Sequence, residues 1–184
     1  GSIRRTPVSG PDIDTPRFEV VQIAAWRDGS AALRDRLSDA GWELPPFGAA
    51  WCDDDRVACS VRPTRWLLIA PAPPSGMTEP TLAERCETLI GDAGAVTDLS
   101  AARCAWRISD PDVSRWLAAG CRLDLHPEAF AVGHAAVTLI AQVPVMVVRR
   151  ASDWLLIAPS SMAEHFDAWL RSARMYSLTG SWTA

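Results

Sequence analysis

The sequence contains Thr64-Arg-Trp-Leu-Leu-Ile-Ala-Pro71 and, in its second half, Ser152-Asp-Trp-Leu-Leu-Ile-Ala-Pro159. The two segments share six consecutive residues beginning with tryptophan, which chance would rarely give. Each Trp-Leu-Leu-Ile-Ala run predicts a short buried strand that ends at its proline. The chain of 184 residues is therefore predicted to contain an internal duplication.

The surroundings of these strands repeat as well. An apolar stretch and a turn precede each strand, residues 57–61 in the first copy and 143–148 in the second, and each pair predicts a β-hairpin. Each strand is followed by a segment whose apolar residues share one face of a helix. These residues are Leu82, Cys86, Leu89 and Ile90 in the first copy and Met162, Phe166, Trp169 and Leu170 in the second.

Upstream of each hairpin the pattern predicts a strand and then a helix. The strand over 18–26 leads to a helix over 30–40, and the strand over 102–108 leads to a helix over 110–119. Further strands are expected over 96–99 and 135–141. Capping residues are expected at both helices: Ser30 and Asp110 as N-caps, Pro111 at the first helical position, and Gly41 and Gly120 as left-handed C-caps.

The order strand, helix, strand, strand, helix in each half predicts an α+β fold of duplicated ferredoxin-like (split βαβ) halves, with antiparallel sheets and packed helices. We place this domain at residues 18–175, with half-repeats of about 18–95 and 96–175. Residues 1–17 are predicted to form an extended N-terminal arm, ordered only against a partner, in which Gly1-Ser2 is interpreted as a tag remnant. Residues 176–184 are predicted to form a C-terminal tail.

Composition excludes several classes of function. The net charge of -4 and the pI of about 5.3, with scattered arginines, argue against a nucleic-acid partner. The longest apolar stretch, residues 135–148, is interrupted by Gln142 and Pro144 and is shorter than the roughly 20 residues of a membrane span. The chain contains no lysine, which excludes a Schiff-base lysine, a P-loop lysine and a Ser-Lys pair. Five cysteines without a regular framework predict reduced thiols in the cytoplasm.

The sequence predicts no catalytic, cofactor-binding or metal-binding residue. His126, His134 and His165 have no carboxylate or cysteine at ligand spacing. The run Asp53-Asp54-Asp55 lacks the spaced oxygen ligands of a calcium loop and predicts a solvated turn. Neither a nucleophile motif nor a Gly-rich dinucleotide motif is present. Helix termini or exposed helix faces explain the paired carboxylates Asp110/Asp112 and Glu84/Glu87 and the pair Ser160-Ser161.

Nine tryptophans against one tyrosine are unusual for a chain of this size. Trp66, Trp106 and Trp154 belong to predicted strands, and Trp116 and Trp169 to apolar helix faces, so most should lie in the core. A core of 20.0 kDa rarely holds nine indoles, and a few are expected at a subunit interface, where tryptophan is enriched.

A longer stretch of sequence resembles a known family. Asp98-Leu-Ser-Ala-Ala-Arg-Cys-Ala-Trp-Arg-Ile-Ser-Asp-Pro-Asp-Val113, followed by Leu117-Ala-Ala-Gly-Cys-Arg-Leu-Asp-Leu-His-Pro-Glu-Ala-Phe130, is similar to the gamma subunit of heterotetrameric sarcosine oxidase. The likeness extends over about residues 18–172 and includes Pro63-Thr-Arg-Trp-Leu-Leu68. More distantly, the chain resembles the folate-binding fold of glycine cleavage system aminomethyltransferases. In those enzymes a Tyr-Thr-Gly-Glu segment before the last strand helps to hold folate. Here Arg149-Arg-Ala-Ser-Asp-Trp154 stands in its place, without the glycine and the glutamate, which argues against a tetrahydrofolate site.

The resemblance implies a non-catalytic structural subunit in a complex with alpha, beta and delta subunits. Such a complex oxidatively demethylates sarcosine to glycine, with tetrahydrofolate as one-carbon acceptor and hydrogen peroxide as product. The resemblance places FAD, FMN, NAD, tetrahydrofolate and zinc on the partner subunits and no cofactor on this chain. The alternatives are the equivalent subunit of a complex that acts on another N-methyl amino acid such as N-methylglutamate, a free-standing folate-dependent aminomethyltransferase-like protein, and a scaffold unrelated to amine oxidation.

Overall fold

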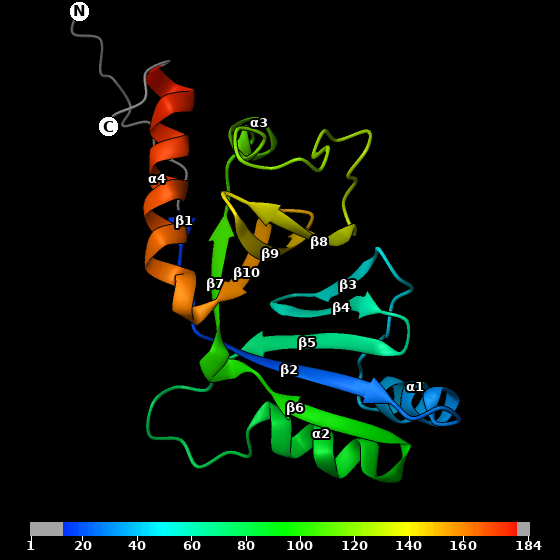
Figure 1. Ribbon diagram of the computed structural model, residues 1–184. Helices are drawn as coiled ribbons and strands as arrows, with labels where there is room; N and C mark the ends of the chain where they lie inside the picture. Colours follow the sequence, from blue (N-terminus) through cyan, green and yellow to red (C-terminus); the bar gives the residue numbers. More distant parts are fainter. Residues whose placement is uncertain (1–12, 180–184) are drawn as a thin grey trace, which may run out of the picture.

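A computed structural model describes residues 13–179 as two antiparallel five-stranded sheets packed face to face, with helices on the outer face of each sheet (Figure 1). The predicted α+β class, with antiparallel sheets and packed helices, is confirmed. Gly1-Ser2, most of the predicted arm and Trp182 lie outside the described residues.

The first sheet is built from the first half of the domain. Its order is β3 (Ala50–Asp53), β4 (Arg56–Arg62), β5 (Arg65–Pro71), β2 (Phe18–Ala25) and β6 (Gly94–Asp98). Its outer face carries α1 (Ser30–Asp39) and α2 (Leu82–Ile90), which lie together below this sheet in Figure 1.

The second sheet has the order β1 (Ile13–Asp14), β7 (Arg103–Ile108), β10 (Trp154–Pro159), β9 (Val143–Arg149) and β8 (Ala135–Ile140). Its outer face carries α3 (Val113–Leu117) and α4 (Ala163–Thr179). Short 3₁₀ turns lie at Gly91–Ala93, Ser100–Ala102 and Ser160–Met162.

Each strand of one sheet has a counterpart at the same place in the other sheet. The edge strands next to β2 and β7 are the exception to the division into halves, because each comes from the half of the chain that forms the other sheet. The strand expected at the start of the second half-repeat is β6, which pairs with β2 in the first sheet. The corresponding place in the second sheet is filled by β1 of the N-terminal arm, which pairs with β7. The described end of the arm therefore pairs within the chain, in contrast to the expectation that it is ordered only against a partner. The ferredoxin-like description of each half stays a prediction.

The repeated pentapeptide is apolar throughout because each sheet is covered on both faces. In β5, Trp66 and Leu68 pack against α1 and α2, whereas Leu67 and Ile69 face the second sheet. In β10, Trp154, Leu156 and Ala158 pack on the helix side, and Leu155 and Ile157 face the first sheet. Since neighbouring side chains of a strand point to opposite faces, a strand buried on both sides needs a continuous apolar run.

A pair of equivalent hydrogen bonds joins the two sheets where β3 and β8 begin. The Ala50 amide donates to the Gly133 carbonyl at 2.8 Å, and the Ala135 amide donates to the Gly48 carbonyl at 3.0 Å. Gly48 and Gly133 both have left-handed backbones, with φ of 85° and 84°, a conformation that glycine adopts without steric cost. The two halves are thus joined by the same local structure from each side.

Helix termini differ in detail from the sequence prediction. Gly29, not Ser30, is the N-cap of α1, and Gly41 has the left-handed backbone expected of it. The helix expected over 110–119 is only the five residues of α3, with Asp112 as N-cap, because Asp110 instead accepts the Asp112 amide in a turn. The helix α4 continues to Thr179 and so includes the first residues of the predicted tail.

A further difference concerns Ser160-Ser161 and Gly120. The two serines form a 3₁₀ turn before α4, and no side-chain hydrogen bond caps that turn. Gly120 is absent from the residues with positive φ, so it is not the left-handed C-cap that we predicted. A Cβ built on Gly120 would lie 2.4 Å from the Trp169 ring. Close packing against α4, rather than backbone conformation, is what requires glycine there.

We predict that Gly120→Ala lowers the free energy of unfolding by about 1–3 kcal/mol, because the added methyl must displace the Trp169 indole from a packed site. Urea unfolding followed by tryptophan fluorescence measures the loss. Ala119→Ser, at the exposed neighbouring position, is the matched control and should unfold like the parent chain. Equal midpoints for the two variants would show that the contact with Trp169 does not constrain position 120.

Candidate functional site

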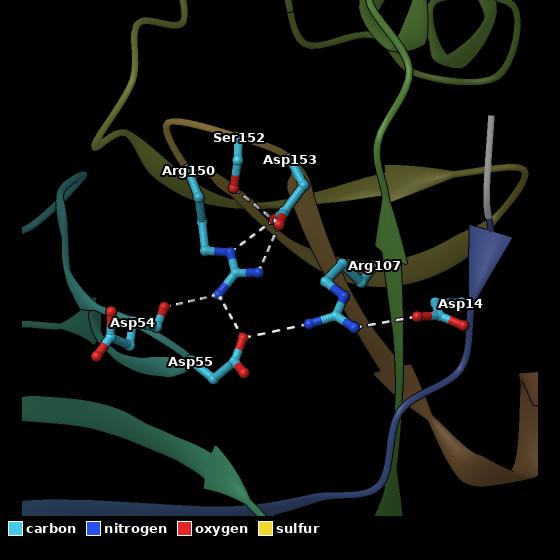
Figure 2. A network of polar contacts seen from close by, with 7 residues as sticks. All are labelled: Asp14, Asp54, Asp55, Arg107, Arg150, Ser152 and Asp153. Atoms are coloured by element: carbon cyan, nitrogen blue, oxygen red, sulfur yellow. Dashed lines mark hydrogen bonds and ion pairs between the residues drawn. The ribbon is translucent and has the colours of Figure 1, made fainter. Parts of the chain in front are cut away.

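A network of charged side chains fills one corner between the two sheets, beside the hairpin that joins β9 to β10 (Figure 2). At its centre is the pair Arg150–Asp153, whose side chains are only 6% and 7% exposed. The Arg150 Nε donates to Asp153 Oδ1 and its Nη2 donates to Asp153 Oδ2, both at 2.6 Å. This two-point geometry is the strongest arrangement available to a guanidinium and a carboxylate.

The same network reaches into the first sheet and into the N-terminal arm. The Arg150 Nη1 donates to the Asp54 carbonyl at 3.2 Å and lies 3.6 Å from Asp55 Oδ1. The guanidinium of Arg107 lies 3.2 Å from Asp55 and 3.0 Å from Asp14, as the dashed lines in Figure 2 show. The turn between β3 and β4, the strand β7, the hairpin before β10 and the strand β1 are therefore held together by one set of charges.

The neighbouring carboxylates favour the charged form of Arg150. Burial by itself would lower the pKa of Arg150, but the hydrogen bonds and charge of Asp153, followed by the charge of Asp55, outweigh burial and raise that pKa. Asp153 is the acid in the segment before the last strand, where the sequence predicts no tetrahydrofolate site, and both of its oxygens are bound by Arg150. The arrangement is suited to holding two sheets together rather than to capturing a ligand.

The Asp53-Asp54-Asp55 run comprises the last residue of β3 and the β3–β4 turn, as predicted, but it is more than a solvated turn. Asp53 pairs with Arg56, and Asp55 contacts both Arg107 and Arg150. Sequence reasoning missed this role because the contacts cross from one half of the chain to the other. The one signal in the sequence for a charged pair here was the spacing of Arg150 and Asp153, which places them on either side of a hairpin turn.

His165 lies on α4, whereas His126 and His134 both lie in the segment between α3 and β8. His165 is exposed on α4. His126 belongs to a turn in which its carbonyl accepts the amides of Ala129 and Phe130. The ring of His134 meets Phe130 edge-on. Within residues 13–179, no three His, Cys, Asp or Glu side chains are grouped so that they could hold a metal ion.

All five cysteines are free thiols. Burial raises the pKa of Cys59 to about 12 and the pKa of Cys86 to about 11. Partial burial, against the opposing charge of Arg150, also raises the pKa of Cys52. A raised pKa keeps a thiol protonated and unreactive, so none of these three is an activated nucleophile.

A cleft of about 750 Å³ lies where the arm passes between the two halves, lined in part by Glu19, Cys104 and Asp167. Its two most enclosed carboxylates already have partners. Glu19, which sequence reasoning missed, accepts the Leu82 amide at the start of α2 at 3.1 Å. Asp167 accepts the Trp106 indole N–H at 3.0 Å and pairs with Arg171, and these two hydrogen bonds lower its pKa. These two carboxylates of the cleft therefore hold α2 and α4 in place.

Tryptophan burial follows the sequence prediction in most cases. The buried indoles are those of Trp42, Trp66, Trp106, Trp116 and Trp154. By contrast, Trp26 is 55% exposed and Phe47 is 72% exposed. Large apolar side chains left in water at such positions are candidates for contact with another protein.

Comparison with known sequences identifies the family. Residues 31–175 match the profile described as "Sarcosine oxidase, gamma subunit family". This chain belongs to that family.

Curated relatives agree with this assignment. The gamma-family chain is 36% identical over 112 residues to the sarcosine oxidase subunit gamma of Arthrobacter sp., a match that covers 60% of this chain and 53% of the relative. It is 35% identical over 113 residues to the subunit of the same name from Corynebacterium sp. (strain P-1), with the same coverage of each chain. The chain spans about half the length of the curated relatives that it matches.

A solved structure supports the fold over nearly the whole chain. The gamma-family chain superposes on a chain of the heterotetrameric sarcosine oxidase from Corynebacterium sp. U-96, solved in complex with pyrrole 2-carboxylate, with a TM-score of 0.78 and 26% identity. The match covers 95% of this chain and 88% of the other. In residues 13–179 we find no helix with the length and apolar character to cross a bilayer.

We predict that Asp153→Ala lowers the free energy of unfolding by about 3–5 kcal/mol, because it leaves the buried Arg150 charge without its two-point partner. Chemical denaturation measures the loss. Asp92→Ala is the control, since Asp92 pairs with Arg36 in full solvent and its removal should change stability little. The double change Arg150→Met with Asp153→Leu should restore part of the loss by removing the uncompensated charge. Identical behaviour of Asp153→Ala and Asp92→Ala would contradict the assigned role of the network.

We also predict that Cys59 and Cys86 resist a thiolate-selective reagent at pH 8 in the folded chain. A pKa of about 11 leaves about one thiolate in a thousand at that pH, and burial restricts access further. Mass spectrometry of labelled peptides, before and after unfolding in urea, gives the readout. Rapid labelling of Cys59 in the native chain would contradict the burial described above.

Proposed function

We propose that this chain is a non-catalytic structural gamma subunit of a heterotetrameric sarcosine oxidase complex in the cytoplasm. The complex oxidatively demethylates sarcosine to glycine, passes the one-carbon unit to tetrahydrofolate and releases hydrogen peroxide. The observation that carries the proposal is the superposition of 95% of the chain on a chain of a heterotetrameric sarcosine oxidase. Family membership over residues 31–175 supports it independently.

The non-catalytic role rests on how the candidate groups are occupied. The acid in the segment that corresponds to the folate-binding glutamate is bound at both oxygens by Arg150. Glu19 is committed to the start of α2, and Asp167 to Trp106 and Arg171. Burial raises the pKa of the Cys59 and Cys86 thiols and so keeps them protonated. Each of these three carboxylates would have to leave its structural partner before it could act on a substrate.

The cofactors of such a complex belong, in this proposal, to the alpha, beta and delta subunits: FAD, FMN, NAD, tetrahydrofolate and zinc. The part of this chain is to cover apolar surface of those subunits and to fix their relative position. The exposed side chains of Trp26, Phe47 and Val132 are suited to this. Phe47 and Val132 directly precede Gly48 and Gly133, so they lie at equivalent places on either side of the junction between the sheets.

We predict that an affinity tag on this chain, used in its source cells, recovers flavin-containing partner subunits. The recovered assembly should consume oxygen and form hydrogen peroxide with sarcosine, while the purified chain alone should do neither. Flavin absorbance and a peroxide assay measure both outcomes. Assays with N-methylglutamate and other N-methyl amino acids distinguish sarcosine oxidase from the equivalent subunit of a related complex.

The same material tests the remaining alternatives. Titration calorimetry with tetrahydrofolate on the isolated chain should give no heat of binding. Micromolar binding there would replace the structural role with that of a folate-dependent transferase. Recovery of partners that contain no flavin would instead favour a scaffold unrelated to amine oxidation.

A further inference from the structure

The duplicated fold creates two equivalent corners between the sheets, each beside the hairpin that precedes the repeated tryptophan. In the second sheet that hairpin is Arg150-Ala-Ser-Asp153, and in the first sheet it is Arg62-Pro-Thr-Arg65. The arginine that begins each hairpin is the same. The residue before the tryptophan is an aspartate in one copy and an arginine in the other, so the two corners have different charges.

The corner of the second hairpin is closed by groups of the chain itself. Asp153 neutralises Arg150 from within the hairpin. The β3–β4 turn then brings Asp55 between Arg150 and Arg107, at 3.6 and 3.2 Å (Figure 2). An acidic turn thus docks into the space between the sheets and is bound there by two guanidinium groups.

At the corner of the first hairpin, each acidic component is replaced. Arg65 stands in place of Asp153. The turn between β8 and β9, which corresponds to the β3–β4 turn, is Ala141-Gln142 and carries no carboxylate. On the central strands Gln22 stands in place of Arg107, because Gln22 pairs with Leu67 as Arg107 pairs with Leu155. Arg62 is retained in place of Arg150 and Arg65 adds a second positive charge, whereas the carboxylates that would balance them are missing.

What remains at this corner is an open cleft of about 380 Å³. Arg62, Arg65 and Arg103 line it, and no carboxylate does. Arg62 and Arg65 are exposed, and in the described part of the chain no ion pair involves any of the three arginines. The rest of the lining is largely apolar and includes Val61, Leu67, Val137, Met146 and Ile157.

The apolar surface continues from the cleft onto the edge strand β8. Val137 is 60% exposed and Leu139 is 54% exposed, and by strand alternation both lie on the side of β8 that faces the first sheet. Three unbalanced positive charges beside exposed aliphatic side chains are complementary to an acidic segment that also carries apolar residues.

We propose that this open corner is the docking site for an acidic loop of a companion subunit, which enters between the sheets as the Asp54–Asp55 turn enters the closed corner. Carboxylates of the loop bind Arg62, Arg65 and Arg103, and its apolar side chains cover Val137 and Leu139. This inference rests on the proposed role as a subunit of an oxidase complex. It adds the surface that is used and the chemistry of the partner segment.

The absence of lysine from the chain permits a direct test. Arg65→Lys introduces a single side-chain amine into the chain at this corner, and a carbodiimide joins an amine to a carboxylate only where the two are in contact. In the complex recovered through a tag, we expect a cross-link from position 65 to an aspartate or glutamate of a companion subunit, located by mass spectrometry. Arg115→Lys, at an exposed position of α3, is the matched control and should give no such cross-link.

A charge reversal measures the contribution of the corner to assembly. Arg65→Asp recreates the Arg-x-x-Asp hairpin of the closed corner, so Arg62 acquires a partner within the chain. We expect the affinity for the companion subunit to fall by about tenfold or more, with a weaker dependence on salt. Arg115→Asp should leave both unchanged. Because Arg65 is exposed, circular dichroism and the unfolding midpoint should show that the variant folds normally.

The outcomes separate this inference from the proposed function. An active sarcosine oxidase assembly that shows no cross-link at position 65 and no loss of affinity in Arg65→Asp overturns the docking site and leaves the function intact. A cross-link to an acidic loop of a partner without flavin supports the docking site and overturns the function. Cross-links only between two copies of this chain, tight binding of a nucleic acid to the corner, or failure to recover any partner overturns the docking site.

Discussion

Face-to-face packing of the two sheets is the constraint on which the rest of the structure depends. Val20, Val57 and Ile69 from one sheet meet Met146, Leu155 and Ile157 from the other in a shared apolar layer. Each sheet also buries its opposite face under helices. The hydrogen bonds at Gly48 and Gly133 and the charges around Arg150 lie at the margins of that layer. They have their geometry only because apolar burial, the main driving force of folding, brings the sheets together.

Sequence patterns predicted those features that are set within one strand or helix. The repeated Trp-Leu-Leu-Ile-Ala runs, the helix faces around Cys86 and Phe166, and the left-handed Gly41 each depend on neighbours within a few residues. The reason for Gly120 is instead a ring on another helix, Trp169. The exchange of β6 and β1 between sheets was equally hidden, because a strand's own sequence does not specify which edge it joins. Local periodicity therefore identified the elements better than their partners.

The polar corner was less accessible to prediction than the fold. The resemblance to the folate-binding fold singled out Arg149–Trp154 only because this segment lacks the glycine and the glutamate of a folate site. It could not indicate that Arg150 reaches Asp54, a residue 96 positions earlier in the chain. The aspartate run was assigned to solvent for the same reason, since its counter-charges come from the other half. The sequences Arg62-Pro-Thr-Arg65 and Arg150-Ala-Ser-Asp153 show by themselves that the two hairpins differ in charge. They do not show that each hairpin lies at a corner between the sheets, one filled by the β3–β4 turn and the other open.

The pairing of β1 with β7 also bears on how the chain is synthesised. Ile13 and Asp14 of β1 lie opposite Ile108 and Arg107 of β7. Arg107 lies 93 positions further along the chain than Asp14, so β1 cannot pair with β7 until that stretch has been translated. Contacts of such long sequence separation form late and slow the folding of β-rich proteins. The two halves are consequently interlocked, and expressing the second half alone would leave its sheet without an edge strand.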